Sequence, residues 1–121
     1  MTQKTNLLYE KCLDFSVRII KLYEYLMENK IKFVLPKQIL GSGTSIGAQI
    51  GESKGAQSGA DFITKLHISL KEARETEYWL DLLRRVNYID QNQYDSLFKD
   101  LNQIIALLIS TLKSTKARLN S

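Results

Sequence analysis

The stretch Gly41–Gly59, GSGTSIGAQIGESKGAQSG, contains all six glycines of the 121-residue chain. Five of them, from Gly43 to Gly59, recur at every fourth residue. A step of four returns an α-helix nearly to the same face, and each helical glycine costs about 1 kcal/mol relative to alanine. Such a stripe is tolerated where it lets another helix approach closely. The stretch therefore predicts tight helix packing rather than a catalytic site.

Successive steps of four do not stay on one line, because each step drifts by about 40° around the helix. We therefore expect Gly43, Gly47 and Gly51 to share a face that packs closely against another helix. Gly55 and Gly59 are rotated away from that face and are predicted to form the following turn. The stretch contains no GxxxxGK[ST] motif and follows no strand pattern, so the glycines do not indicate a nucleotide site.

The rest of the chain shows apolar residues at alternating steps of three and four, which is typical of amphipathic helices. We expect helices from about residue 6 to 29, from the turn containing Pro36 to about 56, from about Ser58, and after Asp90. Asp90 and Gln93 have the spacing of a capping box. Short connections between four such helices predict an all-α, antiparallel up-down-up-down four-helix bundle that forms a single domain over residues 1–121.

Two predicted helices have more apolar residues than a bundle core requires. The main stripe of the first helix comprises Leu8, Cys12, Phe15, Ile19, Leu22 and Leu26. The surplus residues lie beside the main stripes of the first and last helices and are Leu13, Ile20, Met27, Phe98, Ile105 and Leu112. We interpret this surplus as a subunit interface of a homo-oligomer. The alternative is a wide core within one chain.

Composition is that of an ordinary soluble globular protein, with 44% hydrophobic and 25% charged residues. No apolar run is long enough to predict a membrane span, and the first residues lack the apolar region of a signal peptide. The single cysteine, Cys12, excludes an internal disulfide and fits a reducing compartment. We therefore expect a cytoplasmic protein without membrane contact.

Candidate catalytic or metal-binding groups are sparse. His67 is the only histidine, so a zinc site with the usual three or four protein ligands is not expected. Cys12 has no neighbouring base in the sequence, and no Glu-x-x-His pair of a di-iron bundle is present. The sequence predicts no catalytic residue, metal or cofactor. A deep pocket lined by Glu52, Glu72 or His67 with strongly shifted pKa values would instead indicate an enzyme.

The net charge of +4 leaves nucleic acid as a candidate partner. In an up-down bundle the first and third connections lie at the same end, and we expect five basic residues to gather there with Tyr88 as a stacking group: Lys30, Lys32, Lys37, Arg84 and Arg85. The competing interpretation is an ordinary solvated end, because Glu28, Asp81 and Asp90 oppose them. No acidic residue follows Asp100, whereas Lys113, Lys116 and Arg118 do. A protein-binding scaffold without nucleic-acid binding is the alternative function.

Three segments resemble a known bacterial family. Thr44–Ser53, TSIGAQIGES, is similar to that family's SIGANIAE-type stretch. Residues 65–73, KLHISLKEA, with residues 75–80, ETEYWL, look like its third helix, and residues 33–38, FVLPKQ, match the entry into its second. The chain departs from the usual pattern at Gln49, Gly51 and Ser69. The family comprises four-helix-bundle proteins encoded in intervening sequences of 23S ribosomal RNA genes.

The resemblance covers nearly the whole chain and implies properties beyond those read from the residues. It implies a four-helix bundle that assembles as a homopentamer. It also implies RNA as a candidate partner, because members have been described in those terms. The family supplies no catalytic residues. The combined prediction is a non-enzymatic, self-assembling bundle with RNA or a protein as its partner.

Overall fold

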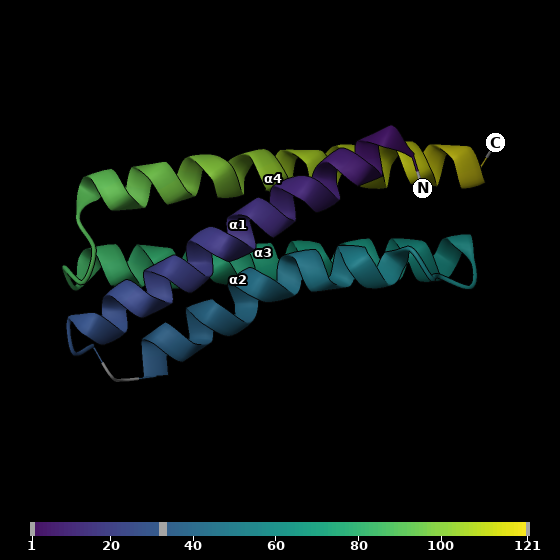
Figure 1. Cartoon of the computed structure of the whole chain (residues 1–121). Helices are drawn as coiled ribbons and strands as arrows, with labels where there is room; N and C mark the ends of the chain where they lie inside the picture. The colour runs from purple at the N-terminus through teal and green to yellow at the C-terminus, as the bar shows by residue number, and fades with distance from the viewer. Residues whose placement is uncertain (1, 32–33, 121) are drawn as a thin grey trace.

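The structure is a computed structural model that describes residues 2–31 and 34–120. It contains helices α1 (Gln3–Glu28), α2 (Val34–Ser53), α3 (Gly59–Arg85) and α4 (Gln91–Leu119). The helices run up and down beside one another, and both chain ends lie at the same end of the bundle (Figure 1). Each helix contacts its two neighbours in the cycle α1, α2, α3, α4, whereas in the described residues the backbones of the diagonal pairs stay more than 8 Å apart between Cα atoms. The predicted all-α four-helix bundle is confirmed.

The core consists mainly of the apolar stripes that the sequence predicted. A fully buried Leu, Ile or Phe side chain stabilises a fold by about 1.5–3 kcal/mol relative to an exposed one, so stripes at helical spacing direct each helix inward. On α1 all six residues of the main stripe are buried: Leu8, Cys12, Phe15, Ile19, Leu22 and Leu26. On α3 and α4 the buried apolar residues include Leu66, Leu80, Leu83, Leu97, Leu101, Ile104 and Leu108.

Small hydroxyl residues join α2 to α3 inside this core. The buried Ser69 hydroxyl donates a 2.8 Å hydrogen bond to the carbonyl oxygen of Ile46. About two turns further along α3, the Thr76 hydroxyl oxygen lies 2.9 Å from the Ser42 hydroxyl oxygen of α2, and both residues are buried. Buried polar groups are costly unless they are paired. These two contacts therefore favour a single register of α2 against α3.

Local sequence signals set where the helices begin. The Asp90 carboxylate accepts a hydrogen bond from the backbone N–H of Gln93, and the Gln93 side chain accepts one from the backbone N–H of Asp90, each at 2.8 Å. The predicted capping box is thus present. Helix α1 begins at Gln3, earlier than predicted, because the Thr2 hydroxyl accepts a hydrogen bond from the backbone N–H of Thr5.

Two glycines of α2 face α1 at short range. A Cβ atom on Gly43 would lie 2.8 Å from Cγ1 of Ile19, and a Cβ atom on Gly47 would lie 3.0 Å from Cβ of Cys12. Both distances are shorter than van der Waals contact between carbon atoms, which is about 3.5–4.0 Å. At these two positions only glycine lets the backbone of α2 come this close to α1.

The remaining glycines of the ladder differ from one another. A Cβ atom on Gly51 would meet the Tyr9 ring at 3.4 Å, which is close to ordinary contact. Gly55 lies in the turn after α2, as predicted. Gly59 does not lie in that turn: it is the first residue of α3, and a Cβ atom there would lie 2.7 Å from both Cδ atoms of Leu119. The turn ends one residue earlier because Ser58 caps α3.

The chain leaves α1 and α3 through left-handed residues that are not glycine. Lys30 has φ 61° and Asn87 has φ 63°. After Lys30, the backbone N–H of Ile31 reaches back to the carbonyl oxygen of Leu26 at 2.9 Å, which is the long hydrogen bond of a Schellman motif. Asparagine tolerates this conformation, but lysine pays a steric cost in it.

We expect Lys30→Gly to raise the free energy of unfolding by about 1 kcal/mol, because glycine adopts φ > 0 without a Cβ clash. For a chain of this size the melting temperature should rise by about 4 °C. Thermal unfolding followed by circular dichroism measures the effect. Lys30→Ala is the matched control, since it removes the same charge but keeps the Cβ atom. Equal stability of the two variants would contradict the strain at Lys30.

Candidate interaction surfaces

Helix α1 carries an exposed apolar strip on the side that faces away from the core. Its members are Leu13, Val17 and Ile20, which are 42%, 55% and 45% exposed. Beside the strip, a hollow of about 620 Å³ lies between α1 and α2, and small residues of α2 line it: Thr44, Gly47, Ala48 and Gly51. We call the strip and the hollow together the α1–α2 face. It combines apolar side chains with a recess into which further side chains could pack.

The sequence predicted part of this face and omitted part of it. Leu13 and Ile20 were assigned to an interface, and both line the hollow. Met27, assigned with them, is half-buried. Val17 was omitted, although it follows Leu13 by four residues and precedes Ile20 by three, which is the helical spacing that places all three on one side. Its exposure could not be read from the sequence, since it depends on where α2 lies.

The surplus stripe of α4 does not form a second exposed face. Ile105 and Leu112 are only 4% and 5% exposed within the single chain, and Phe98 is half-buried. The stripe continues to Leu119, which packs against Gly59 of α3. Helix α4 touches two neighbours, α1 and α3, and therefore buries a wider arc than one stripe. Ile105 and Leu112 thus belong to the core, which corrects their assignment to a subunit interface.

Helix α1 is held to α4 partly by a polar bridge. The Arg18 guanidinium donates to the Asp100 carboxylate at 2.7 Å, to the Ser96 carbonyl at 3.0 Å and to the Ser96 hydroxyl at 2.8 Å. Among the described residues this is the one ion pair that joins two helices. Both charged side chains are more than one third exposed, so the bridge adds little stability. It nevertheless fixes the position of α1 beside α4 by three directed bonds.

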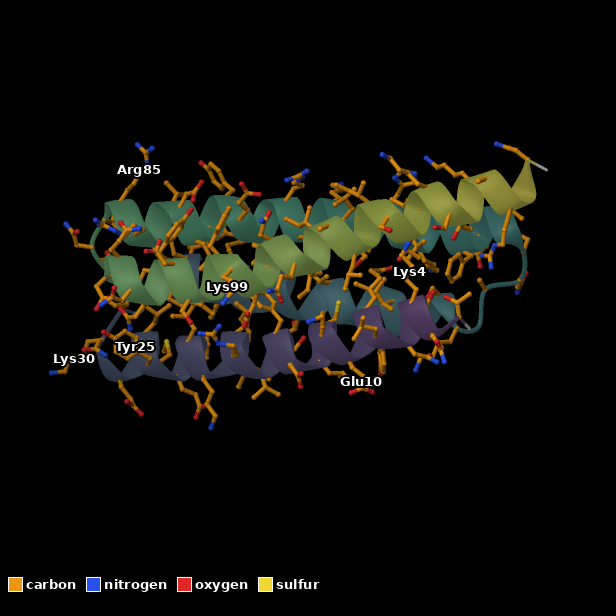
Figure 2. The ribbon with its side chains drawn as sticks, turned by 90° about the horizontal axis from the view of Figure 1, so that it is seen from above. Lys4, Glu10, Tyr25, Lys30, Arg85 and Lys99 are labelled. Atoms are coloured by element: carbon orange, nitrogen blue, oxygen red, sulfur yellow. The ribbon has the colours of Figure 1, made fainter. Side chains whose placement is uncertain are left out.

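The basic residues predicted at the end with the first and third connections do not form one patch. Lys30 and Arg85 lie at that end of the bundle but at opposite edges of it (Figure 2), because α1 and α3 are diagonal partners. The Arg84 guanidinium donates to the side-chain oxygens of Gln91 and Asn87. Lys37 is exposed on the first turn of α2, and Lys32 lies outside the described residues.

Acidic and aromatic groups that are held in place make this end of the bundle less suited to binding RNA. The Tyr94 hydroxyl donates to the Asp81 carboxylate at 2.6 Å, and burial together with this bond raises the pKa of Tyr94 to about 12. Asp90 is held as the cap of α4. Tyr88, the predicted stacking group, is partly buried against the core. Carboxylates therefore remain among the basic residues, and the predicted stacking ring is partly buried. The exposed aromatic ring beside Lys30 is that of Tyr25, which is 39% exposed (Figure 2).

The structure does not bring the candidate catalytic residues together. Glu52 lines the α1–α2 face and His67 is exposed on α3. Burial raises the pKa of the Glu72 carboxyl, Glu75 raises it further and Lys71 opposes the shift. Burial alone raises the pKa of the Cys12 thiol from 9.0 to about 12, which disfavours the reactive thiolate. Within residues 2–31 and 34–120, no group of three His, Cys, Asp or Glu residues could hold a metal ion.

No helix in the described ranges is both long and apolar enough to span a membrane.

Comparison with known proteins gives a family but no activity. A solved structure from Bacteroides thetaiotaomicron, a protein of unknown function from the S23 ribosomal protein family, superposes with a TM-score of 0.89 at 55% sequence identity. The match covers 92% of this chain and 99% of that one. No curated protein sequence matches the chain. The model of the 23S rRNA-intervening sequence proteins matches residues 4–110, and the chain therefore belongs to this family.

Proposed function

We propose that this chain is a non-enzymatic bundle protein that assembles with copies of itself through the α1–α2 face. The observation that carries the proposal is the exposed strip of Leu13, Val17 and Ile20 beside a recess lined by small residues. Apolar side chains at such exposure are stabilised by about 1 kcal/mol each when a partner covers them. Close approach of a second helix is possible along the α2 wall of the recess, where Gly47, Ala48 and Gly51 are small.

The assembly is tested by its mass in solution. We expect light scattering to give a multiple of the 13.9 kDa chain, with about 70 kDa for the homopentamer that the family resemblance implies. The double variant Val17→Glu, Ile20→Glu should dissociate at least about 100-fold more readily, because it places two charges in an apolar interface. Circular dichroism should remain that of a helical bundle, since both residues are exposed.

Leu7→Glu provides the matched control. Leu7 lies on the same helix and is 50% exposed, but it does not line the hollow. It should leave the assembled mass unchanged. A wild-type chain that remains monomeric at micromolar concentration, or a double variant that assembles like the wild type, would contradict the proposal.

RNA is the proposed partner of the assembled protein. The supporting observation is the uneven distribution of charge along the chain: residues 3–15, 44–71 and 106–120 contain eight Lys or Arg against four Asp or Glu, whereas residues 16–43 and 72–105 contain nine of each. Binding would rest on phosphate contacts and would fall steeply with salt. The alternative is a scaffold that binds only protein, and it would show no affinity for RNA at low salt.

A further inference from the structure

We infer that the RNA-contacting surface is the C-terminal part of α4 with the start of α1, and not the opposite end of the bundle. We call it the terminal basic surface and define it by Lys4, Lys113 and Lys116. The inference rests on the proposed RNA binding and specifies where on the chain it occurs. The first support is the charge division, because the whole excess of +4 falls in the half of each helix nearer the chain termini.

A contact across the α1–α4 seam brings Lys4 of α1 to the C-terminal part of α4, which also carries Lys113 and Lys116. The Lys4 ammonium donates to the Ser114 hydroxyl of α4 at 3.2 Å, and Figure 2 shows Lys4 beside the C-terminal part of that helix. Lys113 and Lys116 lie one turn apart on α4 and are exposed. Neither of them forms an ion pair with any residue in the described ranges. Two ammonium groups of α4 and that of Lys4 on α1 therefore lie at the end of the bundle that holds the chain termini.

The side chains around these lysines suit a phosphate backbone. Ser110, Ser114 and Ala117 are small, so they allow a close approach to the helix. Serine hydroxyls are also common phosphate ligands. No acidic residue follows Asp100 along α4, whereas at the opposite end Asp81 and Asp90 are fixed in place by hydrogen bonds.

The surface remains open in the proposed assembly. The α1–α2 face is built from residues 9–20 of α1 and from α2, whereas the terminal basic surface consists of Lys4 at the start of α1 and two lysines near the end of α4. Each copy in an oligomer would then present one such surface, and several weak phosphate contacts would act together. Lys113 and Lys116 lie beyond residue 110, where the family match ends.

The test compares two triple variants with the same loss of charge. One is Lys4→Gln, Lys113→Gln, Lys116→Gln, and the other is Lys30→Gln, Lys37→Gln, Arg85→Gln at the opposite end. Fluorescence anisotropy with a labelled oligouridine measures the Kd over a range of salt concentrations. We expect the first variant to weaken binding at least about 10-fold at low salt and to reduce the slope of log Kd against log salt by about two. The second variant should change the Kd by less than about 2-fold.

The outcomes separate the location from the function. If the wild type binds and the second triple variant loses as much affinity as the first or more, the location is overturned and RNA binding stands. If the wild-type protein shows no salt-dependent binding even at low salt, the proposed RNA function is overturned, and the location with it. Circular dichroism and assembled mass identify any triple variant that has lost its fold. In that case the single substitutions Lys113→Gln and Lys37→Gln compare the loss of RNA affinity at the two ends of the bundle.

Discussion

Gly43→Ala is expected to lower the free energy of unfolding by about 2 kcal/mol, although alanine is the better helix former. The added Cβ atom would lie 2.8 Å and 2.9 Å from Cγ1 and Cγ2 of Ile19. Both carbons are bonded directly to the Ile19 Cβ, and a β-branched side chain in a helix has essentially one χ1 rotamer. Ile19 cannot turn away, so α1 and α2 must separate. Overpacking costs up to about 3 kcal/mol, and the gain in helix propensity of about 1 kcal/mol offsets part of it.

Gly41→Ala is the control for this prediction. Gly41 is exposed on the same helix, and a Cβ atom there would meet nothing within 4 Å. Here only the helix propensity changes, and we expect stability to rise by about 0.5–1 kcal/mol. Urea unfolding at one protein concentration measures both variants, since assembly would make stability depend on concentration.

A double-mutant cycle tests the cause of the Gly43 effect. In an Ile19→Ala background the clashing carbons are absent, so Gly43→Ala should become stabilising. The coupling energy between positions 19 and 43 should then be at least about 2 kcal/mol. Equal effects of Gly43→Ala in both backgrounds would show that the contact with Ile19 does not control the spacing of the two helices.

The thiol of Cys12 is expected to react about 1000-fold more slowly with a disulfide reagent at pH 8 in the folded protein than in urea. Cys12 is fully buried, and burial raises its pKa from 9.0 to about 12. Three pKa units correspond to about a 1000-fold smaller thiolate fraction, and the thiolate is the reacting species. Native labelling within about 10-fold of the rate in urea would contradict this burial.

The same shift predicts how stability depends on alkaline pH. The folded-state pKa is raised, so the thiol contributes stability that is complete below pH 9 and is lost as the pH rises toward 12. The full contribution is on the order of 4 kcal/mol. Tyr94 also has a raised pKa of about 12, and a comparison with Cys12→Ala removes its effect. The difference in the free energy of unfolding between the wild type and Cys12→Ala should shrink above pH 9. A constant difference from pH 8 to 11 would contradict the raised pKa of the Cys12 thiol.

Local signals in the sequence were sufficient to predict the four helices and most of the residues buried in the core. The steps of three and four on α1 predicted every buried residue of its main stripe, because burial on one side of a helix imposes that period directly. The capping box at Asp90 was equally predictable, since it depends on residues three apart. The early start of α1 at Gln3 was missed because Thr2 precedes the first apolar repeat.

The candidate surfaces were predicted less completely, because they depend on which helices are neighbours. Ile105 and Leu112 looked like surplus apolar residues, yet α4 contacts both α1 and α3 and buries them. Lys30 and Arg85 were expected to lie together, yet they belong to diagonal helices and lie at opposite edges of one end. Nothing in the local spacing distinguishes an adjacent helix from a diagonal one.

The sequence by itself therefore determined four amphipathic helices, their direction and two glycines, Gly43 and Gly47, that pack closely against another helix. These properties follow from helical periodicity and from the absence of a side chain, and both can be read from consecutive residues. Tertiary structure alone decided that Val17 is exposed beside a recess, that Ile105 is buried, and that Lys4 reaches α4 at Ser114. Those facts depend on distances between residues up to 110 positions apart, and packing of the four helices sets these distances.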